Sequence, residues 1–231
     1  ITSTIPVASG LGSGAAVTVA LLRALSSTVH RPPSDEEVNA FAYEIEKLHH
    51  GTPSGIDNTV ITYARPVYFI KLPPSPFGGG AGGGVQTFKV GAPFTLIIAD
   101  TGVRAPTKES VGDVRKLWEA DKPKWEKVFD EIGKIAQKAK EKIENGEWQS
   151  LGALMDANHS LLQQLTVSSP ELDHLTEAAR KSGASGAKLS GGGRGGNLIA
   201  LVERDKAASI AESLLSAGAK RTIITEITSQ N

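Results

Sequence analysis

The sequence contains no cysteine, a single methionine and few aromatic residues, which make up 5% of its 231 positions. Without cysteine the chain can form no disulfide, use no thiolate nucleophile and hold no cysteine-ligated metal. Its 25 basic and 25 acidic side chains cancel, and they form no basic cluster of the kind that binds nucleic acid. The sequence has no apolar run of membrane-spanning length and no basic-then-apolar start typical of a signal peptide. We therefore expect a soluble, cytoplasmic protein whose partners include neither nucleic acid nor a membrane.

Glycine, in contrast, is abundant, and a first glycine-rich segment, PVASGLGSG, occupies residues 6–14. The apolar, alanine-rich run at residues 15–25 that follows it predicts a buried helix. Backbone N–H groups and the helix dipole favour an anion at a helix start, and glycine lets the backbone approach phosphate oxygens closely. The segment lacks the Gly-Lys-Ser/Thr of a Walker A loop and the full spacing of a dinucleotide loop. A simple tight turn is the alternative interpretation.

A second glycine-rich segment, KLSGGGRGG, occupies residues 188–196 and precedes a predicted strand at 198–202. Five glycines in six positions suit a backbone that packs closely against a ligand or another loop. A flexible hairpin connection is the alternative. The arginine within the segment, Arg194, could contact a phosphate or pair with an acidic side chain, and the sequence leaves both open.

Two acidic residues frame the segment EKLHHGTPSGIDN at residues 46–58. We expect Glu46 on a helix and Asp57 on the loop that follows. Such a pair suits metal-assisted proton abstraction, in which one carboxylate holds a cation and the other accepts a proton. The alternative is a capped helix end with solvated acids. Zinc is disfavoured, because no third nitrogen ligand accompanies His49 and His50 at a convincing spacing.

These three segments, in this order, resemble the conserved motifs of the GHMP kinase superfamily and, within it, of the mevalonate kinases. A fourth segment, DTGVRAPTK at residues 100–108, resembles the substrate-side threonine segment of the family. The resemblance extends from about Ile1 to Val202. Each glycine motif alone is weak evidence, whereas the ordered set with its HGTPSGIDN core is specific.

The resemblance implies an α+β fold with two lobes and an active site in the cleft between them. Residues 1–86 would form an incomplete N-terminal lobe, similar to ribosomal protein S5, and residues 87–231 a ferredoxin-like C-terminal lobe. The uneven order of predicted strands and helices is itself typical of α+β proteins. The predicted elements are strands at 66–70, 94–99, 198–202 and 221–227 and helices at 15–25, 39–48, 108–121, 124–145, 148–165, 170–182 and 206–217. Ser34 and Glu37 predict a capped helix start, and residues 73–84 a surface excursion or linker.

The resemblance also implies ATP-dependent phosphorylation of the primary hydroxyl of mevalonate to 5-phosphomevalonate, a step toward isoprenoid precursors. Asp57 would be the general base, and Glu46, with Ser13, would bind Mg²⁺. Phosphoryl transfer requires positioning and charge neutralisation more than covalent chemistry, and Mg²⁺ takes oxygen ligands. Thr107 and Gly192 would lie near the substrate or the transferred phosphoryl group. The implied ATP contacts are Ser3, Ala8, Ser9, Gly10, Leu11, Gly12, Ser13 and Gly14.

The sequence departs from the family pattern in two places. Gly14 stands where the family usually has a serine whose hydroxyl reaches the metal, so either Ser13 or a water takes that role or the metal affinity is weaker. The sequence begins at Ile1, without the family's opening segment and its nucleotide-contacting lysine, and we expect it to be a fragment. A related GHMP kinase for phosphomevalonate, a sugar or homoserine, or a non-catalytic nucleotide-binding fragment, are the alternatives, and a homodimer stays open. Arg104 and Lys108 flank Thr107 and could help to bind an anionic substrate.

Overall fold

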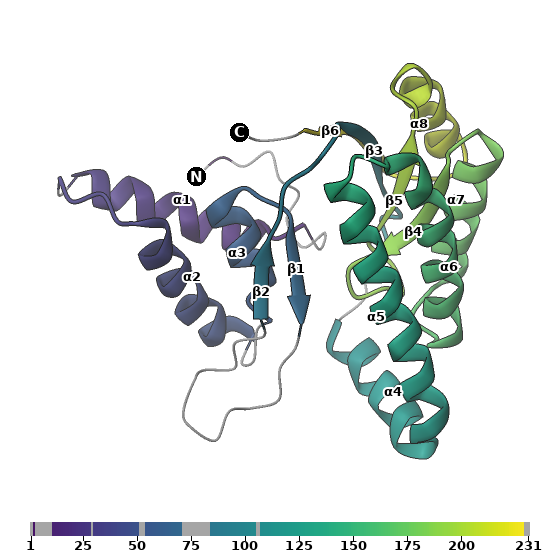
Figure 1. Cartoon of the computed structure of the whole chain (residues 1–231), viewed down its shortest axis with the longest axis horizontal. Helices are drawn as coiled ribbons and strands as arrows, with labels where there is room; N and C mark the ends of the chain where they lie inside the picture. The colour runs from purple at the N-terminus through teal and green to yellow at the C-terminus, as the bar shows by residue number, and fades with distance from the viewer. Residues whose placement is uncertain are drawn as a thin grey trace. The chain divides into compact units, whose positions relative to one another are not determined.

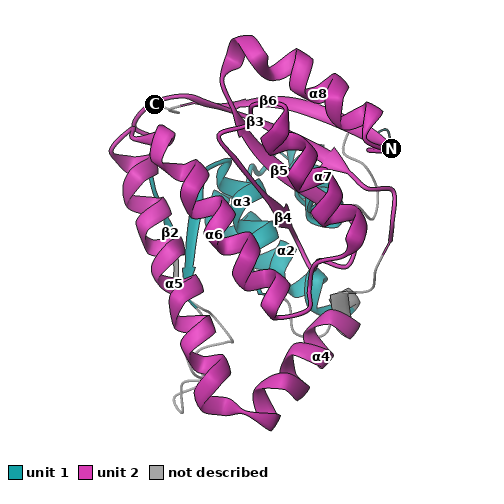
Figure 2. Ribbon diagram, turned by 90° about the vertical axis from the view of Figure 1, so that its right-hand side faces the viewer, with its two compact units in different colours: residues 1–89 teal, residues 90–231 magenta. Residues whose placement is uncertain are grey.

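The structure is a computed structural model that describes residues 2, 11–28, 30–50, 54–70, 84–104 and 107–228. The chain forms two compact units, residues 1–89 and residues 90–231 (Figures 1 and 2). The lobe boundary expected from the sequence lies after residue 86. Each unit has its own core, and the two units are described separately below.

Unit 1 consists of three helices and a pair of short strands. Its elements are α1 (Ser13–Thr28), α2 (Asp35–His50), α3 (Ile56–Tyr63), β1 (Val67–Ile70) and β2 (Gly84–Thr87). The three helices pack on one another around a small apolar core of Val19, Val38 and Ala42, with Leu22 and Ile61 at its edge. The predicted helices at 15–25 and 39–48 and the strand at 66–70 are therefore confirmed as parts of α1, α2 and β1.

Helix α2 begins with the capping interaction predicted from the sequence. The Ser34 hydroxyl oxygen accepts a hydrogen bond from the Glu37 backbone N–H at 3.2 Å, and the Ser34 N–H donates to Glu37 Oε2 at 3.0 Å. This reciprocal pair satisfies two backbone donors that would otherwise lack partners at the helix start. The prediction of a capped start is confirmed.

The expectation that Asp57 lies on a loop is wrong, because Asp57 is the second residue of α3. Gly55 adopts a left-handed conformation, with φ of 81°, directly before this helix. The Thr59 hydroxyl donates to the Gly55 carbonyl at 2.7 Å and reinforces the first turn. A short helix rich in β-branched residues has little helical propensity of its own, and packing against α1 and α2 supplies its stability.

Strand β2 was also not predicted. It pairs antiparallel with β1, with Val67 opposite Thr87 and Ile70 opposite Gly84. Gly84 ends the glycine-rich tract, whose other residues, from 73 to 83, lie outside the described residues. The predicted excursion or linker at 73–84 is therefore described only at this last residue.

Unit 2 is built on a four-stranded antiparallel sheet with strand order β4-β5-β3-β6. The elements in chain order are β3 (Phe94–Asp100), α4 (Thr107–Ala120), α5 (Lys122–Glu144), η1 (Trp148–Ser150), α6 (Leu151–Gln164), α7 (Pro170–Lys181), β4 (Gly186–Ser190), β5 (Asn197–Val202), η2 (Arg204–Lys206), α8 (Ala207–Ser216) and β6 (Arg221–Ile227). This strand order is that of a ferredoxin-like fold, with helices α4 to α7 inserted after the first strand. The strands and helices predicted for this half of the chain are confirmed.

The core of unit 2 lies between the sheet and helices α7 and α8. Helix α7 packs on β4 and β5, and α8 packs on β3 and β6 (Figure 2). Ile97, Leu198, Leu189, Leu172 and Ile210 are almost completely buried there. Burial of each such side chain contributes roughly 1.5–3 kcal/mol to the free energy of folding.

Helix α6 covers the edge strand β4. Asp156 Oδ1 accepts from the Ala187 backbone N–H at 2.9 Å and from Arg180 Nε at 2.7 Å. Covering an edge in this way satisfies backbone donors that could otherwise pair with another chain. β4 leads directly into the second glycine-rich segment, so α6 also fixes the start of that segment.

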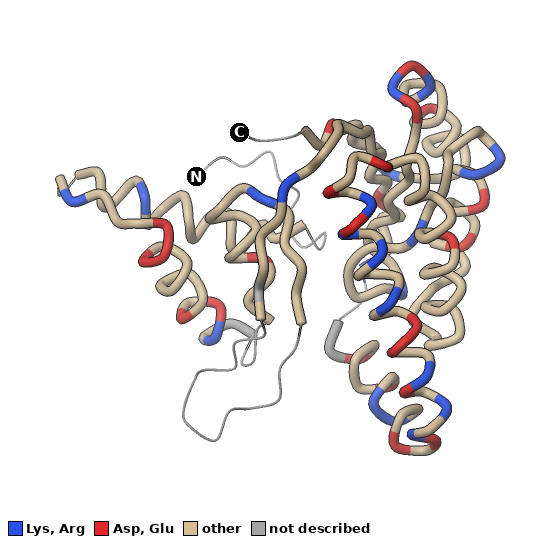
Figure 3. Tube along the Cα trace, viewed as in Figure 1, with Lys and Arg blue, Asp and Glu red and all other residues tan. Residues whose placement is uncertain are grey.

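Helix α5 begins at the N-cap Asp121, whose side chain accepts from the Lys124 N–H, and carries a proline in its first turn. It buries Trp125 and Val128 on one face and carries both basic and acidic side chains elsewhere (Figure 3). Helix α4 also carries side chains of both signs. In the part of the chain that the structure describes, no helix is both long and apolar enough to cross a membrane.

Candidate active site

In unit 1 the end of the first glycine segment lies against Asp57. Gly12 has φ of 68°, and a Cβ atom added there would lie 3.7 Å from both Cβ and Cγ of Asp57 and 3.1 Å from Cδ1 of Ile61. Glycine is therefore required at residue 12 for its backbone conformation and for this close approach. The Asp57 side chain is exposed, while the next residues of α3, Asn58 and Thr59, are buried. The carboxylate is thus open to a ligand beside the loop.

The other acid of the pair lies beside the first turn of α1. A Cβ atom added at Gly14 would lie 3.5 Å from Oε1 of Glu46, and Glu46 is only 8% exposed. The start of α1 carries backbone N–H groups and the positive end of the helix dipole. A buried carboxylate next to a helix start that suits phosphates gives oxygen donors of the kind that Mg²⁺ prefers.

The packing of α3 on α2 fixes the spacing of the two acids. The buried Asn58 side chain donates from Nδ2 to Oδ1 of Asn39 at 2.6 Å. Thr59 also lies within 3.4 Å of the same Asn39 oxygen. Because Asn39 is on α2 with Glu46 and Asn58 is next to Asp57, this contact links the helices that carry the two carboxylates.

The donor set fits a magnesium ion that phosphates help to hold, and it does not fit zinc. Among the described residues there is no group of three or more His, Cys, Asp or Glu side chains that could hold a metal by itself. At such a site Glu46 would supply one carboxylate, and phosphate oxygens and waters would complete the shell. The side chains of His49 and His50 lie outside the described part.

In unit 2 the second glycine segment packs tightly between two other backbone segments. A Cβ atom at Gly193 would overlap the carbonyl oxygen of Val167, and one at Gly195 would lie 2.5 Å from the carbonyl oxygen of Val103. Gly191 and Gly196 also have positive φ, of 86° and 73°, but a Cβ atom there would meet open space. Gly193 and Gly195 therefore lie against other loops, whereas Gly191 and Gly196 have open space beside them.

The segment that leads to Thr107 pairs directly with this glycine loop. Thr101 donates from both its N–H and its hydroxyl to the Gly196 carbonyl at 2.9 Å, and the Gly196 N–H donates to Val103 at 2.8 Å. Thr107 is the first residue of α4, and its side chain lies outside the described part, as does that of Lys108. The structure thus places the two segments predicted for the substrate side next to each other within unit 2.

Arg194 pairs with an acidic side chain, which is one of the two alternatives left open by the sequence. Its Nη1 atom donates to Oδ2 of Asp113 at 2.7 Å, and its Nε atom donates to the Thr166 carbonyl at 3.2 Å. Hydrogen bonds from Lys116 and then from Arg194 hold the pKa of Asp113 below its usual range. Asp113 lies on α4, far from Arg194 in sequence.

Two titratable side chains lie at the strand that enters the glycine loop: His159 is buried, and Lys188 is partly buried. His159 on α6 is 2% exposed; its Nδ1 accepts from the Leu189 N–H at 3.3 Å, and its Nε2 faces Asp173 Oδ1 at 3.1 Å. Burial lowers the pKa of His159, although Asp173 opposes the effect. Burial also lowers the pKa of Lys188 to about 8, and its Nζ donates to the Leu189 carbonyl at 2.7 Å.

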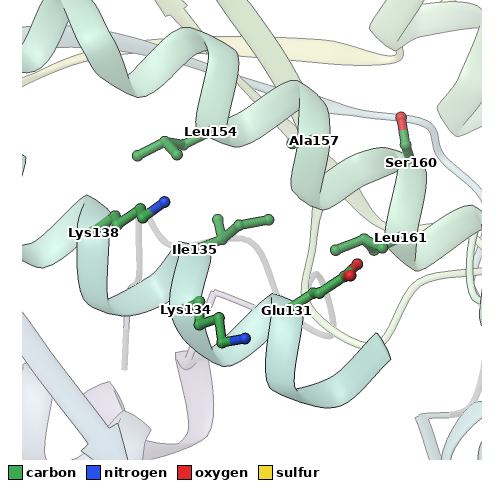
Figure 4. Close-up of a pocket in the computed structure, with 8 residues that line it drawn as sticks. All are labelled: Glu131, Lys134, Ile135, Lys138, Leu154, Ala157, Ser160 and Leu161. Carbon is green, nitrogen blue, oxygen red and sulfur yellow. The ribbon is translucent and has the colours of Figure 1, made fainter. Parts of the chain in front are cut away.

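A shallow groove of about 430 Å³ lies between α5 and α6 (Figure 4). Ile135, Leu154 and Leu161 form its apolar floor, and Lys134 and Lys138 stand at its rim. The residues that line it include none of those predicted for the site. The groove therefore carries no part of the argument for function.

Of the predicted site residues, Ser3, Ala8, Ser9 and Gly10 lie outside the described residues. The structure brings Gly12, Gly14, Glu46 and Asp57 together in unit 1, with Leu11 and Ser13 beside them in the chain. Gly192 lies in the loop that pairs with the segment before Thr107, and Arg104 is exposed on that segment. Sequence reasoning did not identify Asp113 as the partner of Arg194, because Asp113 stands in no motif.

Comparison with known proteins shows the family to which this chain belongs. Residues 1–65 match the family described as GHMP kinases N terminal domain, and residues 139–220 match GHMP kinases C terminal. A crystal structure of mevalonate kinase from L. major in complex with R-mevalonate is 34% identical, with a TM-score of 0.88 over 96% of this chain and 67% of that chain. This chain belongs to the GHMP kinase superfamily.

Within the GHMP kinases, the curated relatives with similar sequences include mevalonate kinases. The protein from Pyrococcus horikoshii is 39% identical over 208 residues, and that from Thermococcus gammatolerans is 35% identical over 237 residues. The alignments cover 87% and 100% of this chain but only 58% and 66% of the two relatives. The chain thus spans less than two thirds of the length of these relatives.

Proposed function

We propose that this chain belongs to an ATP-dependent mevalonate kinase, which phosphorylates the primary hydroxyl of mevalonate to give 5-phosphomevalonate and ADP. The observation that carries the proposal is the contact of one glycine loop with both acids, Gly12 against Asp57 and Gly14 against Glu46. A phosphate loop beside an exposed carboxylate and a buried carboxylate is what phosphoryl transfer to an alcohol requires. The similarity to mevalonate kinases supports mevalonate as the alcohol.

In this proposal Asp57 acts as the general base. Its exposed carboxylate, held on α3 next to the loop, accepts the proton as the substrate oxygen bonds to the γ-phosphorus and ADP departs. Glu46 and Ser13 would hold the magnesium ion, and residues 8–14 would bind the phosphates. Magnesium, when bound, neutralises negative charge on the ATP phosphates.

The substrate side is assigned to unit 2 in the same proposal. Thr107 and Gly192 would contact mevalonate or the transferred phosphoryl group, because their segments pair through Thr101, Val103 and Gly196. The open space beside Gly191 and Gly196 supports this assignment. Units 1 and 2 would be the N- and C-terminal lobes of a cytoplasmic kinase.

The deciding experiment measures ADP release from Mg·ATP by this chain with mevalonate, phosphomevalonate, galactose and homoserine in parallel. Of the four alcohols, we expect turnover only with mevalonate. The Asp57→Asn variant should lose this turnover and retain its affinity for the nucleotide. Preference for another alcohol would reassign the substrate within the family. Nucleotide binding without turnover on any alcohol would overturn the proposal in favour of a non-catalytic nucleotide-binding fragment.

A further inference from the structure

The glycine loop of unit 2 meets the turn after α6 at two residues in the left-handed conformation. Arg194 and Thr166 both have φ of 58°, and neither is glycine. The Arg194 N–H donates to the Val167 carbonyl at 2.8 Å, and its side chain donates from Nε to the Thr166 carbonyl. A β-branched residue such as Thr166 rarely adopts this conformation and keeps it only where the surrounding contacts hold it.

The same arginine reaches a third element, helix α4. Its Nη1 atom bonds Oδ2 of Asp113 at 2.7 Å, and the two side chains are 30% and 39% exposed. The guanidinium fork lets one side chain hold the turn and the helix together, which the single ammonium of a lysine does less well. Lys116 contacts the other Asp113 oxygen, but it is 78% exposed and lies on the same helix.

The backbone hydrogen bonds described for the loop join it to segments other than α4. Gly196 bonds to the segment 101–103, and Arg194 N–H bonds to Val167. Helix α4 itself is attached to the core through Val114, Leu117 and Trp118. Within the described part of unit 2, the hydrogen bond from Arg194 to Asp113 joins the glycine loop to α4.

We propose that Arg194 is a positioning residue that fixes the glycine loop against helix α4 through Asp113. The helix begins at Thr107 and the loop contains Gly192, so this link would set the spacing of the two groups on the substrate side. The inference rests on the proposed function, because this spacing affects turnover only if both groups contact the substrate. A partly exposed ion pair contributes little to overall stability, so the expected effect is on placement more than on folding.

Four variants test the link by kinetics: Arg194→Ala, Asp113→Asn, the double variant, and Lys116→Ala as a matched control that removes the other partner of Asp113. We expect Arg194→Ala and Asp113→Asn each to lower kcat roughly 10- to 100-fold, as small misplacements do, with KM for ATP unchanged. The double variant should be no slower than the slower single variant. Lys116→Ala should stay within about twofold of wild type. Losses that multiply in the double variant, or an equal loss in Lys116→Ala, would overturn the link.

Two further variants separate the effect of the Arg194 side chain from the effect of its backbone conformation. Arg194→Gly removes the side chain but accepts a positive φ, so we expect it to be as slow as Arg194→Ala. Arg194→Lys keeps the charge and should recover part of kcat. Full activity in Arg194→Gly would show that the side chain positions nothing. A thermal midpoint within a few degrees of wild type would confirm that each variant is folded.

Hydrogen exchange decides the proposal even if the chain does not turn over mevalonate. We expect the backbone N–H groups of residues 191–196 and of the first turns of α4 to exchange faster together in Arg194→Ala and in Asp113→Asn. Lys116→Ala should leave both segments unchanged. Unchanged exchange in Arg194→Ala would overturn the positioning role, whereas an inactive wild type with this exchange pattern would count only against the proposed reaction.

Discussion

Gly14 and Glu46 lie so close that a Cβ atom added to the glycine would be 3.5 Å from Oε1 of the glutamate. This is an ordinary van der Waals distance, so a small side chain fits at residue 14. The resemblance to the GHMP kinases implies that a serine usually occupies this position and contacts the metal. The geometry therefore allows the family residue to be restored next to the proposed magnesium ligand.

We predict that Gly14→Ser lowers the magnesium concentration needed for half-maximal activity by several-fold. The added hydroxyl would lie beside the Glu46 carboxylate and add an oxygen donor to the site. Gly14→Ala is the matched control, since it fills the same space without a donor, and it should keep the wild-type magnesium dependence. Equal magnesium titrations for the serine and alanine variants would contradict the assignment.

Glu46→Gln should raise the magnesium requirement and leave the fold intact. The amide keeps the shape of the side chain, which is 8% exposed, but removes its negative charge from the phosphate loop. Glu44→Gln serves as control, because Glu44 lies on the same helix and pairs with Lys47 at the surface. Magnesium titrations of activity and of ADP binding check the prediction. A midpoint that does not move in Glu46→Gln would exclude Glu46 as a ligand.

Gly193→Ala should destabilise unit 2 far more than Gly191→Ala. Both glycines have positive φ, so both substitutions cost about 1–2 kcal/mol for the left-handed conformation. Only at Gly193 would the new methyl group also overlap the Val167 carbonyl and force the loop and the turn apart. Urea unfolding of the two variants measures the difference. Equal losses of unfolding free energy would mean that the close contact is not a constraint.

The glycine loop also shows what a sequence can and cannot predict. Its composition predicts close approach of the backbone, but the partner of Gly193 lies at Val167 and that of Gly195 at Val103, far away in the sequence. The pair formed by Arg194 and Asp113 is 81 positions apart, so the sequence left two alternatives for that arginine. Long-range pairing of this kind depends on the tertiary fold.

Local signals, in contrast, were reliable. The capping pair of Ser34 and Glu37 and the helices of unit 2 depend on signals within a few residues, and both were predicted correctly. Helix α3 was missed because it is short and rich in β-branched residues, and it forms where α1 and α2 pack against it. The motif predicts Glu46 and Asp57 as the acids of the site, and the element expected for Asp57 was wrong, because Asp57 lies on α3.

The buried His159 should make unit 2 less stable in mild acid. Burial lowers its pKa in the folded state, so the unfolded chain, with an ordinary histidine pKa near 6.5, binds the proton more readily. The stabilising contribution is complete above about pH 6.5 and is lost as the pH falls through the lower pKa of the folded state. Urea unfolding between pH 7.5 and 5 should show a smaller loss in His159→Gln than in wild type. The control is His174→Gln, at an exposed position on α7, and its unfolding free energy should vary with pH as that of wild type does. If the unfolding free energy of His159→Gln also varied with pH as in wild type, the linkage would be refuted.

Lys188 should change the stability with pH in the same direction as His159, but in alkali. Burial lowers its pKa to about 8 from 10.5, so between these values the unfolded chain binds more protons than the folded chain. Stability linked to this group therefore rises as the pH increases from about 8, and below that the buried charge costs up to about 3 kcal/mol. Lys188→Met keeps the apolar stem and removes the charge, so it should be more stable than wild type at pH 7 by about 1–3 kcal/mol, less the lost hydrogen bond to Leu189. That advantage should shrink toward pH 9.5. In the control variant Lys138→Met, at an exposed position, the difference in unfolding free energy from wild type should stay constant across the same range. Because a lost structural contact would lower stability equally at both pH values, a constant deficit in Lys188→Met would show that burial does not lower the pKa of Lys188 in the folded protein.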